Sequence, residues 1–141
     1  MPKRSFSLIE IIFTIAIISI LAIVTIPKLQ NSLTKTTNIK IKSDIMLIKD
    51  ALYNYKTKYI LSNETTTIES LDDNNKELFS KILKYPIISN SSQKLGTWEK
   101  LANDRYIVWI EDDQPLEFIY DKSNITFDCD HTNSDCQNYT Q

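Results

Sequence analysis

The hydrophobic pattern of the first part of the chain is a continuous apolar run. Residues 8–26 carry a single charge, Glu10, and their other polar side chains are only Thr14, Ser19 and Thr25. As a helix rising about 1.5 Å per residue, the run spans roughly 28 Å, which is close to the thickness of a bilayer core. A core helix of a soluble domain is rarely apolar on every face over this length. The run therefore predicts a membrane-spanning helix.

The pattern changes after Pro27 from uniformly apolar to periodic. Because proline lacks an amide hydrogen, Pro27 is expected to kink the helix or to mark a boundary between two helices. Beyond it, one apolar stripe recurs at intervals of three and four residues, formed by Ile41, Ile45, Ile48, Leu52, Tyr55 and Tyr59. This spacing predicts an amphipathic helix whose stripe packs on the core of its own domain.

The remainder of the chain reads as loops, one short helix and a small sheet. Residues 62–75 and 89–96 are polar and predict loops, and residues 76–84 predict a short amphipathic helix ended by Pro86. Strands are expected at residues 105–111, 116–120 and 125–129, with a fourth near 97–101 and turns at 112–115 and 121–124. The predicted fold class is α+β, with a long helix packed on an antiparallel sheet.

Composition narrows the possible functions. The net charge of −2 gives no broad basic surface for nucleic acid, and the only glycine, Gly96, cannot form a glycine-rich phosphate loop. His131 is the only histidine, and no nucleophile–base arrangement is visible around it. We therefore expect no catalytic activity and no cofactor.

The C-terminal segment holds both cysteines in a polar stretch. Cys129 and Cys136 predict a disulfide in an oxidising compartment, and the alternative is two free thiols in the cytosol. Asp128, Asp130 and Asp135 surround the cysteines and are weak candidates for calcium ligands. A solvated polar tail is the favoured interpretation of these carboxylates, so no metal site is predicted.

Glu10 is the residue that decides between the possible interpretations of the N-terminal apolar run. A secretory signal peptide would have a shorter apolar region and a small-residue cleavage site after it, which the sequence after residue 26 lacks. A plain signal anchor has no use for a carboxylate, which costs about 2.5–3.5 kcal/mol at the centre of a bilayer on insertion scales. An intramembrane charge of this kind indicates a functional site with a partner.

The N-terminus resembles that of type IV pilins and type II secretion pseudopilins. The resemblance rests on the segment Lys-Arg-Ser-Phe-Ser-Leu-Ile-Glu at residues 3–10, the apolar run and Pro27. It implies cleavage between Ser5 and Phe6 by a prepilin peptidase, methylation of the new Phe6 amine, and pairing of that amine with Glu10 of a neighbouring subunit. Ser5 and Ser19 stand where the family usually has glycine.

The resemblance also implies an organisation and a location. Residues 1–5 would be the leader, 6–27 the transmembrane and filament-core helix, 28–60 the amphipathic helix and 61–141 the globular pilin-like domain. The chain would cross the bacterial inner membrane once, with a periplasmic C-terminal domain, and would assemble with other subunits through an inner-membrane platform and an ATPase. A minor pseudopilin or a divergent pilin fits better than a major pseudopilin. The alternative function is a non-polymerising, membrane-anchored periplasmic binding domain.

Overall fold

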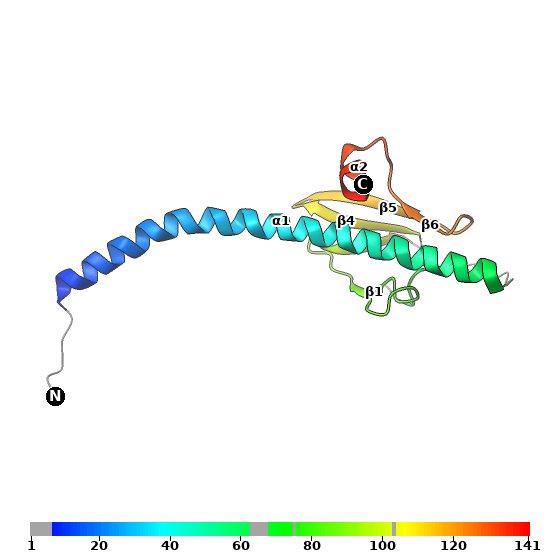
Figure 1. Cartoon of the computed structure of the whole chain (residues 1–141), viewed down its shortest axis with the longest axis horizontal. Helices are drawn as coiled ribbons and strands as arrows, with labels where there is room; N and C mark the ends of the chain where they lie inside the picture. Colours follow the sequence, from blue (N-terminus) through cyan, green and yellow to red (C-terminus); the bar gives the residue numbers. More distant parts are fainter. Residues whose placement is uncertain (1–6, 63–67, 75, 103) are drawn as a thin grey trace, which may run out of the picture. The chain divides into compact units, whose positions relative to one another are not determined.

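The computed structural model of the chain describes residues 7–62, 68–74, 76–102 and 104–141. Within them, the first helix is α1, Leu8–Ser62. A two-stranded sheet pairs β1, Glu77–Leu78, with β2, Ile87–Ile88. A four-stranded antiparallel sheet has the order β3 (Trp98–Ala102), β4 (Arg105–Glu111), β5 (Gln114–Asp121) and β6 (Thr126–Asp128). The last helix is α2, Ser134–Thr140 (Figure 1).

The chain divides into two compact units, residues 1–36 and residues 37–141. The boundary falls within α1, which continues without interruption through Pro27. The predicted α+β class is confirmed. The boundary between two helices, expected at Pro27 as the alternative to a kink, is wrong because α1 is a single helix there, and the kink stays a prediction.

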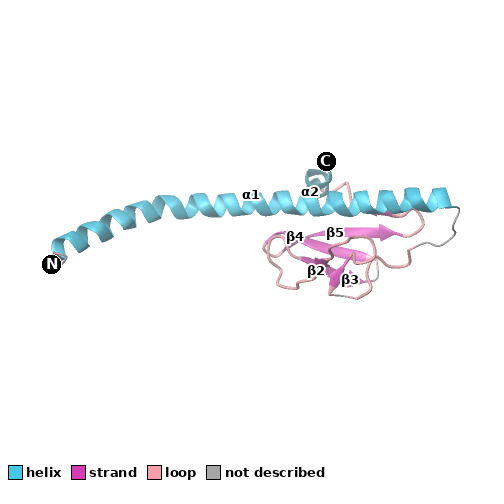
Figure 2. Cartoon of the chain, turned by 60° about the horizontal axis from the view of Figure 1, so that its bottom comes forward, coloured by secondary structure: helices cyan, strands magenta, loops and turns pink. Residues whose placement is uncertain are grey.

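In the unit of residues 37–141, the four-stranded sheet lies along the C-terminal half of α1, as Figure 2 shows. The predicted stripe of α1 is confirmed: Ile41, Ile45, Ile48 and Leu52 are at most 2% exposed, and Tyr55 and Tyr59 pack partly buried against the same core. The sheet contributes alternate side chains to that core, as a half-buried antiparallel sheet does. These are Trp98, Tyr106, Val108, Ile110, Leu116, Phe118, Tyr120 and Phe127.

The four predicted strands are all present, with β4 at its predicted bounds. The turn expected over residues 112–115 is shorter than predicted, because β5 already begins at Gln114 and pairs it with Glu111. Asp113 adopts the left-handed backbone region, with a φ of 62°, in this tight connection. Pro115 is tolerated in β5 because β6 pairs only with residues 119–121, so the missing amide has no ladder partner to lose on that side.

The short helix predicted over residues 76–84 is wrong. This segment contains β1 and then a turn at Phe79, whose φ of 61° is incompatible with a right-handed helix. The Phe79 side chain is fully buried, and its ring lies 4.7 Å from that of Tyr106 and 5.8 Å from that of Trp98. A nine-residue helix has little stability of its own, so burial of one aromatic side chain decides the local conformation.

Residues 68–74 are a loop, as predicted, but they form part of the core. Ile68 and Leu71 are buried, and so is the carboxylate of Asp72. Asp72 accepts hydrogen bonds from the Phe79 amide and the Tyr106 hydroxyl, and the Lys100 ammonium lies 2.7 Å from it. This buried ion pair with its hydrogen bonds joins the loop to β3 and β4.

Gly96 has a structural role at the start of β3. Its φ is +84°, and a Cβ there would lie 2.4 Å from Cγ2 of Thr37 on α1. Its amide donates to the Trp109 carbonyl at 2.7 Å. Glycine therefore permits the close approach of this loop to the helix.

Candidate assembly and processing site

The predicted cleavage and methylation positions, Ser5 and Phe6, lie outside the described residues. The described chain begins at Ser7, whose carbonyl accepts hydrogen bonds from the amides of Glu10 at 3.0 Å and Ile11 at 3.2 Å. Glu10 therefore sits in the first turn of α1. The partial positive charge of a helix N-terminus stabilises a carboxylate at this position.

The other polar side chains of the apolar run form their hydrogen bonds within the helix. The hydroxyls of Thr14, Ser19 and Thr25 donate to backbone carbonyls three or four residues earlier, at 2.8, 2.8 and 2.6 Å. Such bonds allow hydroxyl side chains to lie in an apolar environment at little cost. Among the described residues, the carboxylate of Glu10 has no hydrogen-bonding or ion-pair partner. It is the one polar group of the run left for a partner outside this part of the chain.

The apolar side chains of this run are exposed in the isolated chain. Between Leu8 and Ile26 the large apolar residues are 47–75% exposed. By length and composition α1 contains a segment able to cross a membrane, with a mean hydropathy of 2.7 over a window of which none is buried. The core helix of a soluble domain would instead be covered by its own fold. This exposure fits a membrane-anchored helix.

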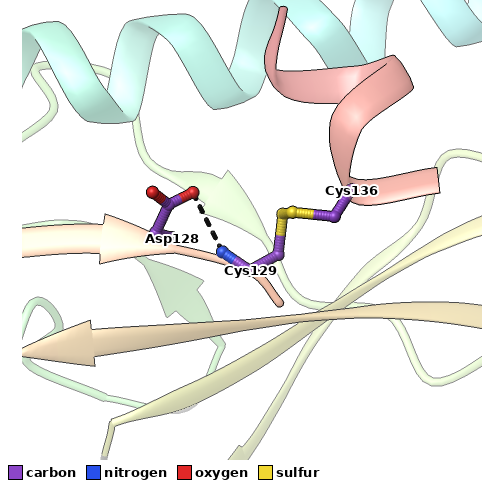
Figure 3. A group of neighbouring side chains, drawn as sticks. All are labelled: Asp128, Cys129 and Cys136. Atoms are coloured by element: carbon purple, nitrogen blue, oxygen red, sulfur yellow. Dashed lines mark hydrogen bonds between the residues drawn. A yellow bond between two sulfur atoms is a disulfide. The ribbon is translucent and has the colours of Figure 1, made fainter. Parts of the chain in front are cut away.

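The C-terminal segment contains the predicted disulfide. Cys129, directly after β6, is bonded to Cys136 on α2 with their Cα atoms 5.8 Å apart (Figure 3). Cys136 is fully buried, and Tyr139 on the same helix donates its hydroxyl hydrogen bond to Asn38 of α1 at 3.0 Å. The disulfide and this bond hold α2 against the core of the 37–141 unit.

The three candidate calcium ligands each have a different protein partner. Asp128 lies 2.9 Å from the Lys49 ammonium and 3.1 Å from the His131 ring nitrogen. Burial raises the pKa of Asp128, but hydrogen bonds from His131, Lys49 and the Cys129 amide outweigh it and leave the pKa lowered.

The other two carboxylates are also engaged. Asp130 accepts from the amide and hydroxyl of Thr132, and these bonds lower its pKa. Asp135 accepts from Gln114 at 3.1 Å. The sulfurs near Asp128 are joined as a disulfide, so they offer no thiolate to a metal. The arrangement favours a structural role for these groups.

Two features of the domain were missed by sequence reasoning. One is α2, whose start was signalled by Asn133: its side chain accepts from the Asp135 amide as a helix N-cap. The other is the buried role of Asp72. No local pattern distinguishes Asp72 from its exposed neighbour Asp73, because their difference depends on β3 and β4 contacting the loop.

Together, these features define a chain with one exposed, membrane-length apolar helix segment that continues into a small α+β domain. Residues 1–26 match a family model described as the prokaryotic N-terminal methylation motif, the signature of type IV pilins and pseudopilins. The match supports the interpretation of the chain as a substrate of prepilin peptidase. Searches of curated proteins gave no significant match, and neither did searches of solved structures.

Proposed function

We propose that this protein is a structural subunit of a type IV pilus-like filament, the class that includes type IV pili and type II secretion pseudopili. Prepilin peptidase would remove residues 1–5 and methylate the amine of Phe6. Residues 6–27 would then lie in the inner membrane and later in the filament core, and residues 61–141 would form the periplasmic domain. The observation that carries the proposal is Glu10, the single unpaired charge in an exposed apolar helix that matches the methylation motif.

The proposed role of Glu10 is to pair with the cationic N-terminus of a neighbouring subunit. Cleavage would create that amine four residues before Glu10, which is about one helical turn. In an apolar environment an opposite-charge pair is much stronger than in water, and a carboxylate left without its partner is costly. Apolar packing alone has no preferred register. One charge pair would therefore select the axial position of each added subunit.

The mature N-terminus is the first test of the proposal. We expect mass spectrometry of the chain from its native membrane to show a start at N-methylated Phe6. A chain that retains Met1 or Pro2 would support the alternative of a non-polymerising anchored domain, and would contradict the filament proposal.

Variants of Glu10 separate charge pairing from a purely local role at the helix N-terminus. Glu10→Gln keeps hydrogen-bonding oxygen and nitrogen atoms in the first turn but removes the charge. We expect it to reduce filament yield by about tenfold or more, because the neighbour's amine is left without its counter-charge. Glu10→Asp keeps the charge and should retain much more of the yield.

Processing and membrane insertion of both Glu10 variants are measured in parallel, so that a loss of filament is attributed to assembly. If Glu10→Gln assembles as well as the parent chain, the carboxylate acts only as a helix-terminal group and the pairing mechanism is wrong.

A further inference from the structure

The second half of α1 carries an exposed apolar row, formed by Ile39, Met46, Tyr53 and Ile60. These four side chains are 64–70% exposed, although the opposite stripe of the same helix is buried. They are seven residues apart, which is two helical turns less about 20°, so they follow one another along one side of the helix. That side lies roughly 130° around the helix axis from the buried stripe. Exposed apolar side chains aligned on one side of a helix form a candidate surface for packing against a partner.

A row of lysines follows the exposed row at the same interval. Lys42, Lys49 and Lys56 each come three residues after a member of the row. Lys49 binds Asp128, and Lys56 donates to the Asn124 carbonyl at 2.8 Å. Within the described part of the chain, Lys42 has neither an ion pair nor a hydrogen bond. The exposed row is therefore flanked by a cation whose charge remains available to a partner.

A groove lies on a different side of the same helix. It consists of two adjoining hollows of about 470 and 210 Å³, which share Asp44, Tyr85 and Ile87. Its walls include apolar side chains that remain largely exposed: Tyr85 is 79%, Ile88 66% and Leu47 54% exposed. This surface, between α1 and the segment 83–98, is a further unpartnered apolar surface of the domain.

The groove also contains an incompletely compensated carboxylate. Asp44 accepts from the Trp98 indole at 3.3 Å and lies 3.7 Å from the Lys40 ammonium, which is itself largely exposed. Burial raises the pKa of Asp44 despite the nearby Lys40 charge. A second cation brought to the groove would be attracted to this carboxylate.

We propose that the exposed row of one copy of this chain docks into the groove of a second copy. Lys42 of the first copy would then lie close to Asp44 in the groove of the second. The two surfaces have complementary character, since the row offers projecting apolar side chains beside a free cation and the groove offers apolar walls beside a carboxylate. This proposal rests on the proposed filament function and identifies a contact between subunits outside the apolar run.

The geometry of the two surfaces favours a repeating contact. Because the row and the groove lie on different sides of α1, each copy can use both at once, and such head-to-tail contacts extend into open helical filaments. Parallel packing of row against row would instead place Lys42 beside its own counterpart, which is unfavourable for like charges. Charge and apolar complementarity therefore favour the row of another copy as the occupant of the groove.

Photo-crosslinking tests the contact in the full-length chain. A benzophenone amino acid is placed at Ile39 of the row, which lies about one helical turn from Lys42, in cells that process and assemble the protein. We expect a crosslinked dimer whose attachment site maps by mass spectrometry to the groove segment around Tyr85 and Ile88. The control position is Ile119, which is 53% exposed on β5 and belongs to neither surface. Attachment to α1 of another copy or to a different protein, no crosslink at all, or equal crosslinking from the control position would overturn the proposal.

A matched pair of charge insertions gives an independent measurement. Met46→Asp places a charge in the row, and Asn54→Asp places the same charge on an exposed position of α1 outside the row and the groove. We expect the first to lower the crosslink yield from Ile39 by about tenfold, and the second to leave it within about twofold. Equal effects of the two substitutions would show that the row is merely a solvated face.

The fate of the N-terminus distinguishes failure of this contact from failure of the proposed function. If Phe6 is methylated and filaments form while Ile39 crosslinks elsewhere, only the docking proposal is wrong. If the N-terminus is unprocessed, the proposed filament function is wrong. The crosslinking result then still tests docking between two copies of the chain, although the chain does not assemble into filaments.

Discussion

Isoleucine is frequent in both parts of α1, but its burial differs between the two parts. Ile18 is 64% exposed in the N-terminal unit, whereas Ile48 is fully buried against the sheet in the unit of residues 37–141. The difference lies in the neighbours that the chain supplies. Residues 37–62 have a sheet of their own to cover one stripe, and residues 8–36 have only the helix. An isoleucine-rich helix segment of membrane-spanning length that stays exposed fits a membrane anchor.

The largest expected effect on folding comes from the buried carboxylate of the domain. Asp72→Ala leaves the Lys100 charge and the Tyr106 hydroxyl buried without their acceptor. We expect a loss of about 3–5 kcal/mol in the free energy of unfolding, measured by denaturant titration of tryptophan fluorescence in detergent. Asp73→Ala, next to it and exposed, should cost less than about 1 kcal/mol. Equal costs would show that the buried network does not hold the loop.

The comparison between the two parts of α1 is tested most directly by one substitution in each. Ile48→Ala should lower the free energy of unfolding of the domain by about 2–5 kcal/mol, because it leaves a cavity in the core. Ile18→Ala removes the same atoms from an exposed position and should change it by less than about 0.5 kcal/mol. A large effect of Ile18→Ala on the isolated subunit in detergent would mean that the N-terminal unit is packed against its own domain.

The disulfide is expected to make the next largest contribution to the free energy of unfolding. Replacing both cysteines by serine is expected to lower the free energy of unfolding by about 2.5 kcal/mol, because the unfolded chain regains the freedom of the short loop between them. Protection of the α2 amides from hydrogen exchange should fall more than that of β4. If α2 remains fully protected, then the hydrogen bond from Tyr139 to Asn38 and burial of the helix are sufficient to hold it.

A smaller effect is expected from titration of the domain core in alkali. Burial raises the pKa of Tyr120 to about 12, and burial together with the Asp72 hydrogen bond also raises the pKa of Tyr106. The unfolded chain releases these protons near pH 10, before the folded chain does. The contribution of these raised pKa values to the free energy of unfolding is fully present below pH 10. It is lost as the pH rises from 10 towards 12.

Absorbance of ionised tyrosine, recorded with fluorescence of the buried tryptophans, follows this alkaline transition. Tyr120→Phe should make the pH dependence shallower in that window, while Tyr53→Phe, at an exposed position, should leave its slope unchanged. The same slope in the parent and in Tyr120→Phe would contradict the assignment.

Sequence reasoning succeeded where a pattern acts locally. The length and uniformity of residues 8–26, the stripe from Ile41 to Leu52, the bounds of β4 and the pairing of the two cysteines followed from periodicity, composition and spacing. For the candidate site, Glu10 was identified because a lone charge in an apolar run is costly wherever the helix lies. The exposed row of α1 was also present in the sequence as a seven-residue repeat. The sequence alone does not show whether such a repeat is exposed or forms a second buried stripe, and only the structure shows that it is exposed.

Tertiary structure decided the features that depend on contacts between distant segments. Phe79 overrides the helical pattern of its own segment because its ring fits among Trp98, Tyr106 and Phe127, and Asp72 is buried because β3 and β4 bring it Lys100 and Tyr106. The groove beside Asp44 exists only when α1 and the segment 83–98 come together. Hydrophobic periodicity is a property of neighbours along the chain, whereas burial, ion pairing and grooves are properties of neighbours in space.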